Sequence, residues 1–246
     1  MPLSPDLDQR IALVTGASRG IGKAVALMLA EAGADVVVNY HERAEEARAV
    51  VEAIRALGRR AIAIGADVSS AAAVAAMTQA IAGQLGPVDI LVNNAGIGLI
   101  RSIDELTEAE FDTTLAVNLK SVFLCTQAVL PQMRARGWGR IVNISSGAAR
   151  GGGGIGVHYN ASKAGMEGLT RGYAARLAAQ GVTVNAVAPS LIETDMMVAR
   201  RDEYVKRIPL GRMGTGEEVA QAVLMVVGNP YMTGQTVQLN GGTQFI

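Results

Sequence analysis

Tyr159 and Lys163, in the stretch YNASK, are the residues whose types and spacing most directly suggest chemistry. If this stretch is helical, residues four apart lie one above the other on the same face, so the phenol and the ammonium group approach a common point. Such a pair can act as an acid whose proton affinity is tuned by a neighbouring cation. The spacing also arises by chance in about one chain in two or three of this length, so its meaning depends on the rest of the sequence.

A glycine-rich stretch, TGASRGIG from Thr15 to Gly22, is a second candidate because it joins a predicted strand to a predicted helix. Its glycines permit a tight turn and allow the backbone to approach a pyrophosphate, which the free N–H groups at the start of the helix bind. Their spacing differs from that of the G-x-G-x-x-G fingerprint. Many α/β proteins use such glycines only to turn, so the stretch alone leaves nucleotide binding and simple turn formation open.

Seven short apolar runs predict the strands that would position these residues. They lie near residues 11–15, 35–40, 61–66, 88–93, 139–145, 182–188 and 235–239. Ala-rich segments of helical length separate most of them, which predicts an α/β fold with a doubly wound, parallel, seven-stranded sheet and helices on both faces, a Rossmann fold. The runs are apolar nearly throughout, as strands buried on both faces must be. We expect one domain over residues 1–246.

The composition of the chain excludes several classes of function. Its 246 residues are 50% hydrophobic and 18% charged, enough to bury a large core, and the formal net charge is zero. Without a block of like charges, neither nucleic acid nor an anionic membrane surface is expected as a partner. No apolar run approaches the roughly 18 residues of a membrane span, so we expect a soluble, cytoplasmic protein. The single cysteine, Cys125, indicates a buried thiol and no internal disulfide, and no metal site is expected.

Five motifs occur in the order and spacing of one family, and the chain from about Gln9 onward resembles the short-chain dehydrogenase/reductases. The motifs are TGASRGIG, NNAG at Asn93 to Gly96, Asn118 in AVNLKSVF, ISS ending at Ser146, and YNASK. Ser146 lies 13 residues before Tyr159, as is usual in the family, and this favours it over Ser145 as the catalytic serine. Without the resemblance, Ser146 would be interpreted as a hydroxyl that satisfies backbone at a strand end.

The resemblance implies a catalytic set of Asn118, Ser146, Tyr159 and Lys163. A free phenol has a pKa of about 10, and Lys163 together with the positively charged nicotinamide of the oxidised cofactor would lower it. Tyr159 would then protonate the carbonyl oxygen during hydride transfer, while Ser146 donates a hydrogen bond to the developing oxyanion. Lys163 would also bind the nicotinamide ribose. Asn118 would place a water that relays protons, or would be only a polar cap within a helix.

The cofactor implied by the resemblance is NADPH/NADP+. NAD enzymes usually carry Asp or Glu at the end of the second strand to bind the ribose hydroxyls, and this chain has Asn39 there. Arg19, in the glycine-rich turn, resembles the basic residue that meets the adenosine phosphate in NADPH-using members, and Arg43 would assist it. The alternative is that Glu42 folds back to bind the ribose while Arg19 is only solvated.

The remaining cofactor contacts follow the family pattern. Asp67 and Val68 resemble the pair that contacts adenine, although Asp67 could instead only cap the following helix. Together with Tyr159 and Lys163, the expected cofactor-binding residues are Gly16, Ser18, Arg19, Gly20, Ile21, Gly22, Asn39, Asp67, Val68, Asn94, Ala95, Gly96, Ile192 and Thr194. A substrate lid is expected over about residues 190–208. The chain departs from the family at Ser190, where Gly commonly follows the proline, and at His158, where Asn is frequent and a role at the pocket edge is expected.

The overall resemblance is greatest to the 3-oxoacyl-[acyl carrier protein] reductases of fatty-acid synthesis. It implies NADPH-dependent reduction of a carrier-bound 3-oxoacyl thioester to the 3-hydroxyacyl product. A reductase of free small ketones or secondary alcohols and a non-catalytic cofactor-binding sensor are the alternatives. Family members pair apolar helices across two-fold axes, so a homotetramer is expected. Relatives acting on carrier-bound substrates place arginines near the pocket mouth; this chain offers Arg134 and Arg136 at one such position but Gln180 at the other.

Overall fold

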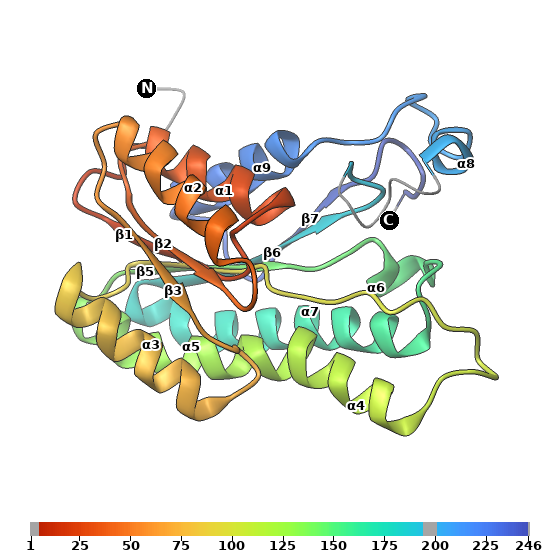
Figure 1. Cartoon of the computed structure of the whole chain (residues 1–246), viewed down its shortest axis with the longest axis horizontal. Coiled ribbons are helices and arrows are strands. Elements are labelled where there is room, and N and C mark those ends of the chain that lie inside the picture. The colour runs from red at the N-terminus through yellow and green to blue at the C-terminus, as the bar shows by residue number, and fades with distance from the viewer. Residues whose placement is uncertain (1–4, 194–200, 246) are drawn as a thin grey trace.

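The computed structural model describes residues 5–193 and 201–245 and contains a seven-stranded parallel sheet (Figure 1). Its strand order is β3-β2-β1-β4-β5-β6-β7. The strands are β1 (Ile11–Val14), β2 (Asp35–Tyr40), β3 (Ala61–Gly65), β4 (Ile90–Asn93), β5 (Gly139–Ile144), β6 (Val182–Pro189) and β7 (Thr236–Leu239). The predicted strands and the doubly wound topology are confirmed, with bounds that shift by one or two residues at most.

Helices cover both faces of the sheet, with α1, α2 and α9 on one face and α3, α4, α5 and α7 on the other (Figure 1). The α-helices are α1 (Gly20–Glu31), α2 (Ala44–Ala56), α3 (Ala71–Gln84), α4 (Glu108–Leu115), α5 (Ser121–Arg136), α6 (Ala148–Gly151), α7 (Val157–Leu177), α8 (Arg201–Val205) and α9 (Gly216–Gly228). A π-helical segment, η1 (Ala116–Lys120), joins α4 to α5, and a 3₁₀ segment, η2 (Ala178–Gln180), follows α7.

Each face of the sheet supports its own hydrophobic core. Side chains alternate between the faces along a strand, so Val36 and Val38 of β2 pack with α1, α2 and α9, whereas Val37 packs on the opposite side. Both sets are fully buried. This two-sided burial is the reason that the strand sequences are apolar throughout.

The longest helical run joins α4, η1 and α5 across residues 108–136. A capping box between Thr107 and Glu110 begins it, because each side chain bonds the other residue's backbone N–H. By length and composition the run could cross a membrane, but 44% of its most apolar window is buried against the rest of the fold. A core helix of a globular domain passes the same test, and this run packs as one.

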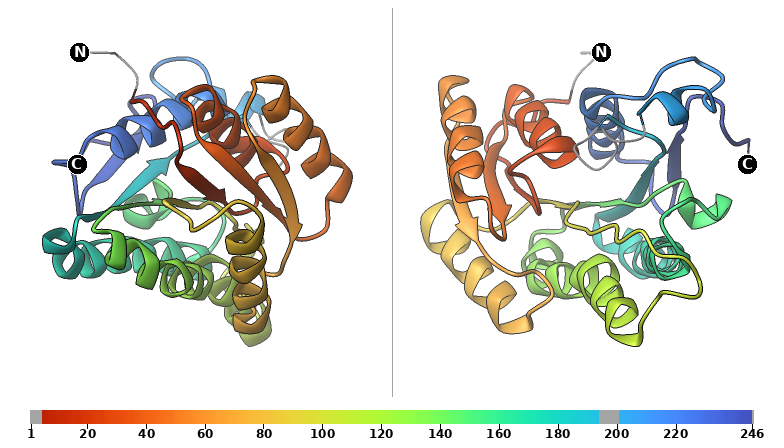
Figure 2. Two further views of the ribbon diagram at one scale, coloured as in Figure 1. Left: turned by 90° about the vertical axis from the view of Figure 1, so that its left-hand side faces the viewer. Right: turned by 45° about the vertical axis from the view of Figure 1, so that its right-hand side comes forward.

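The carboxyl ends of the strands form one edge of the sheet, which comes forward in the right-hand view of Figure 2. The turn after β1 and the loops after β4 and β5 meet there, because β1, β4 and β5 are neighbours. The strand order reverses between β1 and β4, and open α/β sheets bind ligands at such a switch point. Within the expected lid, residues 194–200 lie outside the described part of the chain.

Candidate active site

The turn between β1 and α1 is shaped by glycines and by one asparagine. Gly16 and Gly20 have positive φ angles of 61° and 54°, which favour glycine. A Cβ at Gly22 would lie 2.4 Å from the Gly16 carbonyl oxygen and 2.5 Å from Nδ2 of Asn94, so no side chain fits there. The Asn94 amide donates to the carbonyl oxygens of Thr15 and Gly16 at 2.9 and 3.0 Å. Asn94 therefore fixes the turn from the neighbouring strand.

The amino end of α1 has the features of an anion site. The side chains of Ser70, Thr107 and Thr215 cap α3, α4 and α9, whereas Arg19, at the N-cap of α1, makes no capping hydrogen bond. The first N–H groups of α1 therefore lack a side-chain cap. Because the glycines also let a ligand approach the backbone closely, the turn fits the pyrophosphate of a dinucleotide.

Asn39, at the end of β2, bonds the protein's own backbone. Its buried side chain accepts a hydrogen bond from the Gly16 N–H at 3.2 Å. Its amide donates to the carbonyl oxygens of Tyr40, Ile64 and Ala66 at 3.3, 3.2 and 3.2 Å. A contact between this residue and the cofactor stays a prediction. The position still carries no carboxylate, and its amide joins the glycine turn to β2 and β3.

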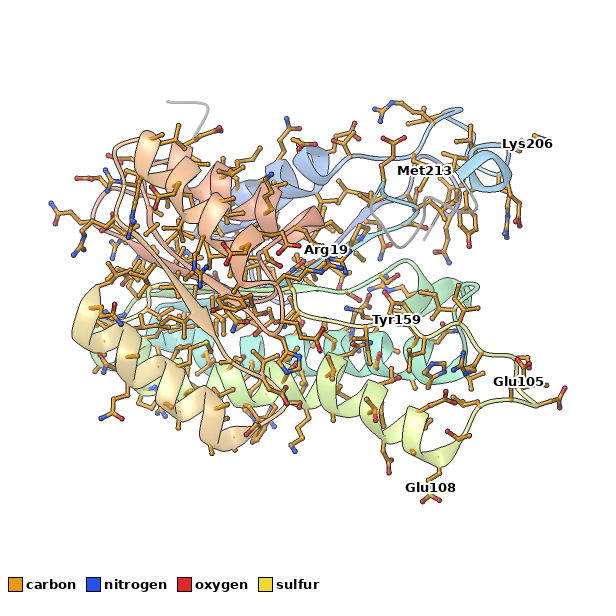
Figure 3. The ribbon with its side chains drawn as sticks, in the orientation of Figure 1. Arg19, Glu105, Glu108, Tyr159, Lys206 and Met213 are labelled. Carbon is orange, nitrogen blue, oxygen red and sulfur yellow. The ribbon has the colours of Figure 1, made fainter. Side chains whose placement is uncertain are left out.

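Two residues expected near the adenosine half make local contacts. Oδ1 of Asp67 accepts from the N–H and the hydroxyl of Ser69 at 2.9 and 2.7 Å, and these hydrogen bonds, the hydroxyl's first, lower the pKa of the Asp67 carboxyl. Arg43, expected to assist Arg19, pairs with Glu46 at 3.1 Å. Arg19 is exposed in the glycine turn, where it lies on the α1 side of the sheet edge, opposite Tyr159 (Figure 3).

The other predicted cofactor residues differ in exposure. Ser18, Val68 and Ile192 are buried, and Ile21 is partly buried. Ile192 also forms an isolated parallel bridge with Gly214, which fixes the start of the segment after β6. Thr194 lies outside the described residues.

The loop after β4 passes directly over the predicted catalytic lysine. Asn118 clamps this loop, because its Oδ1 accepts from the Ile97 N–H at 2.8 Å and its Nδ2 donates to the Ile97 carbonyl oxygen at 3.0 Å. A Cβ at Gly96 would lie 3.2 Å from Oδ1 of Asn118 and 3.7 Å from Nζ of Lys163. Glycine thus brings the loop close to the ammonium group. Asn118 is buried within the π-helical η1, a form of helix that is frequent at functional sites.

Lys163 is a buried cation with one backbone partner. Its Nζ donates to the carbonyl oxygen of Ile144 at 2.7 Å, and burial lowers the pKa of the ammonium group to about 8. The YNASK stretch is helical, as expected, because it lies within α7. Lys163 therefore follows Tyr159 by one turn, and its Nζ lies 5.7 Å from the centre of the Tyr159 ring.

The hydroxyl that reaches the Tyr159 phenol is that of Ser146. Burial raises the pKa of the phenol, and the hydrogen bond with Ser146 partly opposes this. The expectation that Lys163 lowers this pKa is not met in the protein alone, because desolvation is the larger effect. Ser145 instead points into the protein, where its hydroxyl lies 3.3 Å from both the Lys163 carbonyl oxygen and Oε1 of Glu167. Ser145 is thus a structural residue.

An ion pair between the buried Glu167 and the partly exposed Arg150 lies behind these residues and was missed by the sequence analysis. Glu167, one turn beyond Lys163 on α7, is buried and accepts a 2.9 Å hydrogen bond from Nε of Arg150 on α6. The pair ties the segment that follows Ser146 to the helix that carries Lys163. No helical spacing in the sequence points to this pair, because Arg150 lies 17 residues before Glu167 and on another helix.

Arg134 and Arg136 lie far from this site, which corrects their predicted place at its mouth. Both belong to the last turn of α5, at the amino edge of the sheet. Arg136 donates to the Val88 carbonyl oxygen at 2.8 Å and pairs with Asp89 at 3.2 Å, and Arg134 bonds Gln180. In a single chain these arginines therefore bind neighbouring elements at the edge opposite Tyr159.

Known proteins share both the sequence and the fold. The family model of short chain dehydrogenases matches residues 10–205. The 3-oxoacyl-[acyl-carrier-protein] reductase FabG of Staphylococcus aureus is 45% identical over 237 residues, covering 94% of this chain and 96% of the relative. The (2S)-[(R)-hydroxy(phenyl)methyl]succinyl-CoA dehydrogenase subunit BbsD of Thauera aromatica is 41% identical, with 96% and 97% covered.

A crystal structure from Sinorhizobium meliloti 1021, described as a short-chain alcohol dehydrogenase, superposes with a TM-score of 0.91 at 38% identity and covers 97% of each chain. The residues matched by the family model include the glycine turn, Asn94, Tyr159 and Lys163. The chain therefore belongs to the short-chain dehydrogenase/reductase family of NAD(P)-using oxidoreductases.

Proposed function

We propose that this protein is a cytoplasmic, NADPH-dependent ketoreductase that reduces a 3-oxoacyl thioester carried by an acyl carrier protein. The observation that carries the reductase assignment is the grouping of the Tyr159 phenol, the Ser146 hydroxyl and the Lys163 ammonium group beside the glycine turn. The thioester is supported by two relatives, whose names describe a carrier-protein thioester and a coenzyme A thioester.

In the proposed reaction Tyr159 acts as the general acid. Its hydroxyl donates a proton to the carbonyl oxygen of the substrate, and Ser146 donates a hydrogen bond to the same oxygen as negative charge develops there. Protonated Lys163 stabilises the phenolate that remains. Asn118 and Gly96 hold the loop that passes over Lys163 and so keep this group shielded from water. NADPH, when bound, supplies the hydride.

The proposed preference for NADPH rests on charge at the adenosine end. Position 39 carries an amide that is committed to backbone, so no carboxylate there selects the free ribose hydroxyls of NADH. Arg19, exposed on the glycine turn, is placed for the additional phosphate of NADPH. Glu42, exposed after β2, is the residue through which NADH would be preferred instead.

Apolar side chains around the carboxyl edge support an acyl substrate. Ile100 and Ile103 in the loop after β4 are 51% and 78% exposed, and Leu210 is 70% exposed. Ligand pockets are lined mainly by apolar groups, with a few polar groups that fix orientation. A free ketone or secondary alcohol is the alternative substrate, which the description of the Sinorhizobium meliloti structure favours.

An acidic carrier protein would bind at Lys206 and Arg207, and not at the two arginines of α5 that the sequence analysis proposed. Arg134 and Arg136 lie at the opposite edge, whereas Lys206 and Arg207 are exposed directly after α8, and Lys206 lies at the end of the molecule that carries the site (Figure 3). Charge at a docking surface mainly changes the rate of encounter and its salt dependence. We therefore assign these two residues to carrier docking.

We further propose a homotetramer. A shallow groove on α4, η1, α5 and α7 is lined mainly by Leu115, Leu119, Phe123 and Leu169, with Asp112 and Lys120 also in its lining, and Phe123 is 45% exposed. Exposed apolar surface of this kind is typical of an interface, and closed homo-oligomers repeat one such surface around a two-fold axis. A second copy of the chain is the proposed occupant.

The test of the function is the oxidation of NADPH with three substrates that share one 3-oxoacyl group: the carrier-protein thioester, a minimal thioester and a free ketone. We expect the highest kcat/KM with the carrier-bound substrate, by a margin that shrinks as salt rises. The double variant Lys206→Glu, Arg207→Glu should narrow this margin, whereas the matched control Arg134→Glu should not. Equal kcat/KM for all three substrates at low salt would favour the free-ketone reductase.

A further inference from the structure

His158, the residue before Tyr159, is completely buried and holds a loop of the site. Its Nε2 lies 3.0 Å from the carbonyl oxygen of Leu99, in the loop after β4. A carbonyl oxygen only accepts hydrogen bonds, so Nε2 must carry the ring proton. Nδ1 is then an acceptor, and it has no hydrogen-bond partner among the described residues.

The backbone around His158 is shaped to admit its ring. Gly156 has a φ angle of 150°, and a Cβ there would lie 2.5 Å from Cε1 and 2.8 Å from Nδ1 of His158. The neighbouring Ile155 accepts a 3.0 Å hydrogen bond from the Arg101 N–H. The entry to α7 therefore bonds the loop after β4 at two points, Leu99 and Arg101.

These contacts complete a regular pattern along the loop. The protein bonds the backbone of Ala95, Ile97, Leu99 and Arg101, which are alternate residues. In extended backbone, alternate residues direct their N–H and C=O groups to the same side. Hydrogen bonds therefore hold this loop at points from Ala95 to Arg101, beside the start of α7, and His158 is its outer side-chain anchor.

We propose that His158 is a positioning residue that sets the substrate-side wall of the active site through the Leu99 carbonyl. It touches no reacting atom, and it acts on the segment from Leu99 to Arg101, which carries the exposed Ile100. This inference rests on the proposed function, because it predicts that His158 determines how tightly the 3-oxoacyl substrate binds. The cofactor side of the loop has its own anchors at Ala95 and Ile97 and should be unaffected.

Three variants separate the hydrogen bond from simple packing. His158→Leu fills the space without a donor, His158→Gln keeps an N–H donor at a reach similar to that of Nε2, and His158→Asn is one carbon too short. The matched control is His41→Gln, because His41 is the only other histidine and its side chain is 67% exposed.

The kinetic readout is the separate KM for thioester and for NADPH. Loss of a buried hydrogen-bond donor should raise the thioester KM of His158→Leu and His158→Asn by about tenfold, with kcat and the NADPH KM changed by less than about threefold. His158→Gln should restore most of the loss. If His158 served folding alone, its variants would change the KM values for both thioester and NADPH, or neither of them. The effect would then also be the same in variants with and without an N–H donor at this position.

Two further measurements do not require that the thioester be the true substrate. In the single-histidine variant His41→Gln, the ¹⁵N chemical shifts of the remaining imidazole should show a proton on Nε2 and none on Nδ1. Hydrogen exchange of the peptide spanning residues 99–103 should quicken by about tenfold in His158→Leu and stay near wild type in His158→Gln.

The inference is overturned by any of three results: a ring proton on Nδ1, unchanged exchange of residues 99–103 in His158→Leu, or a His158→Gln variant as impaired as His158→Leu. If the protein does not reduce thioesters at all, the proposed function fails, while the imidazole spectrum and the exchange of this loop still decide the role of His158.

Discussion

The ammonium group of Lys163 lies 5.7 Å from the centre of the Tyr159 ring, one turn along the same face of α7. Burial acts on the two groups in opposite directions, since it raises the pKa of the phenol and lowers that of the ammonium group to about 8. In each case burial disfavours the charged form. Burial of the catalytic pair thus lowers the stability of the fold, and the same burial makes the two groups reactive.

This cost predicts a pH-dependent difference in stability between the wild type and Lys163→Met. The folded-state pKa of Lys163 is about 8, below the ordinary value of 10.5. Between these two pH values the unfolded chain binds more protons than the folded protein does. The free energy of unfolding therefore increases as pH rises through this range. The wild-type free energy of unfolding, relative to that of the variant, should increase by roughly 3 kcal/mol across this range. Urea unfolding of both proteins measures it, and a difference that is constant with pH would contradict the buried, depressed lysine.

Asn39→Ala should lower the stability of the fold. It should also weaken the binding of NADH and of NADPH by the same factor. The substitution removes the partner of the Gly16 N–H and the donor to three carbonyl oxygens, which should cost about 2–4 kcal/mol of unfolding free energy. Because the side chain positions the turn and does not read the ribose, the KM values for NADH and NADPH should rise by the same factor. A selective effect on one cofactor would instead indicate that Asn39 contacts that cofactor directly.

Arg19→Ala should instead act on NADPH alone. We expect the wild type to prefer NADPH over NADH by at least about tenfold in kcat/KM, which is about 1.4 kcal/mol and modest for a charged phosphate contact. The variant should lose most of that ratio while its kcat/KM with NADH stays near wild type. Equal use of both cofactors by the wild type would point to Glu42 as the ribose-binding residue.

Phe123→Glu should break the proposed tetramer. It places a charge among the leucines of the groove on α4, η1, α5 and α7, where a second copy of the chain would have to bury it. Light scattering at micromolar concentration should show about four chains for the wild type and fewer for the variant. Tyr231→Glu is the control, because Tyr231 is 98% exposed and is not among the groove residues. A monomeric wild type would refute the assembly.

The strands and the catalytic serine could be predicted from the sequence. The β-branched runs fixed the strands, and the spacing from Ser146 to Tyr159 and Lys163 selected the serine whose hydroxyl reaches the phenol. The strands depend only on the strand period, whereas the choice of Ser146 rested on the resemblance to the family.

The misses depend on contacts between distant segments. The backbone partners of Asn39 could not be predicted, because the turn after β1 and the end of β3 become its neighbours only in the sheet. Arg136 was placed at the wrong edge because its partner Asp89 lies 47 residues away in sequence. The pairing of Glu167 with Arg150 likewise requires knowing how α6 packs on α7.

The most direct test of the central claim is the rate of NADPH oxidation by Tyr159→Phe with a 3-oxoacyl thioester, measured beside NADPH affinity by fluorescence titration. The substitution removes the acid and its hydrogen bond with Ser146, whereas the phenylalanine ring keeps the packing and Lys163 remains in place. The account predicts a fall in kcat of about 10² to 10⁴ with an NADPH Kd within about twofold of wild type. A wild-type rate in Tyr159→Phe would contradict the assignment of Tyr159 as the general acid.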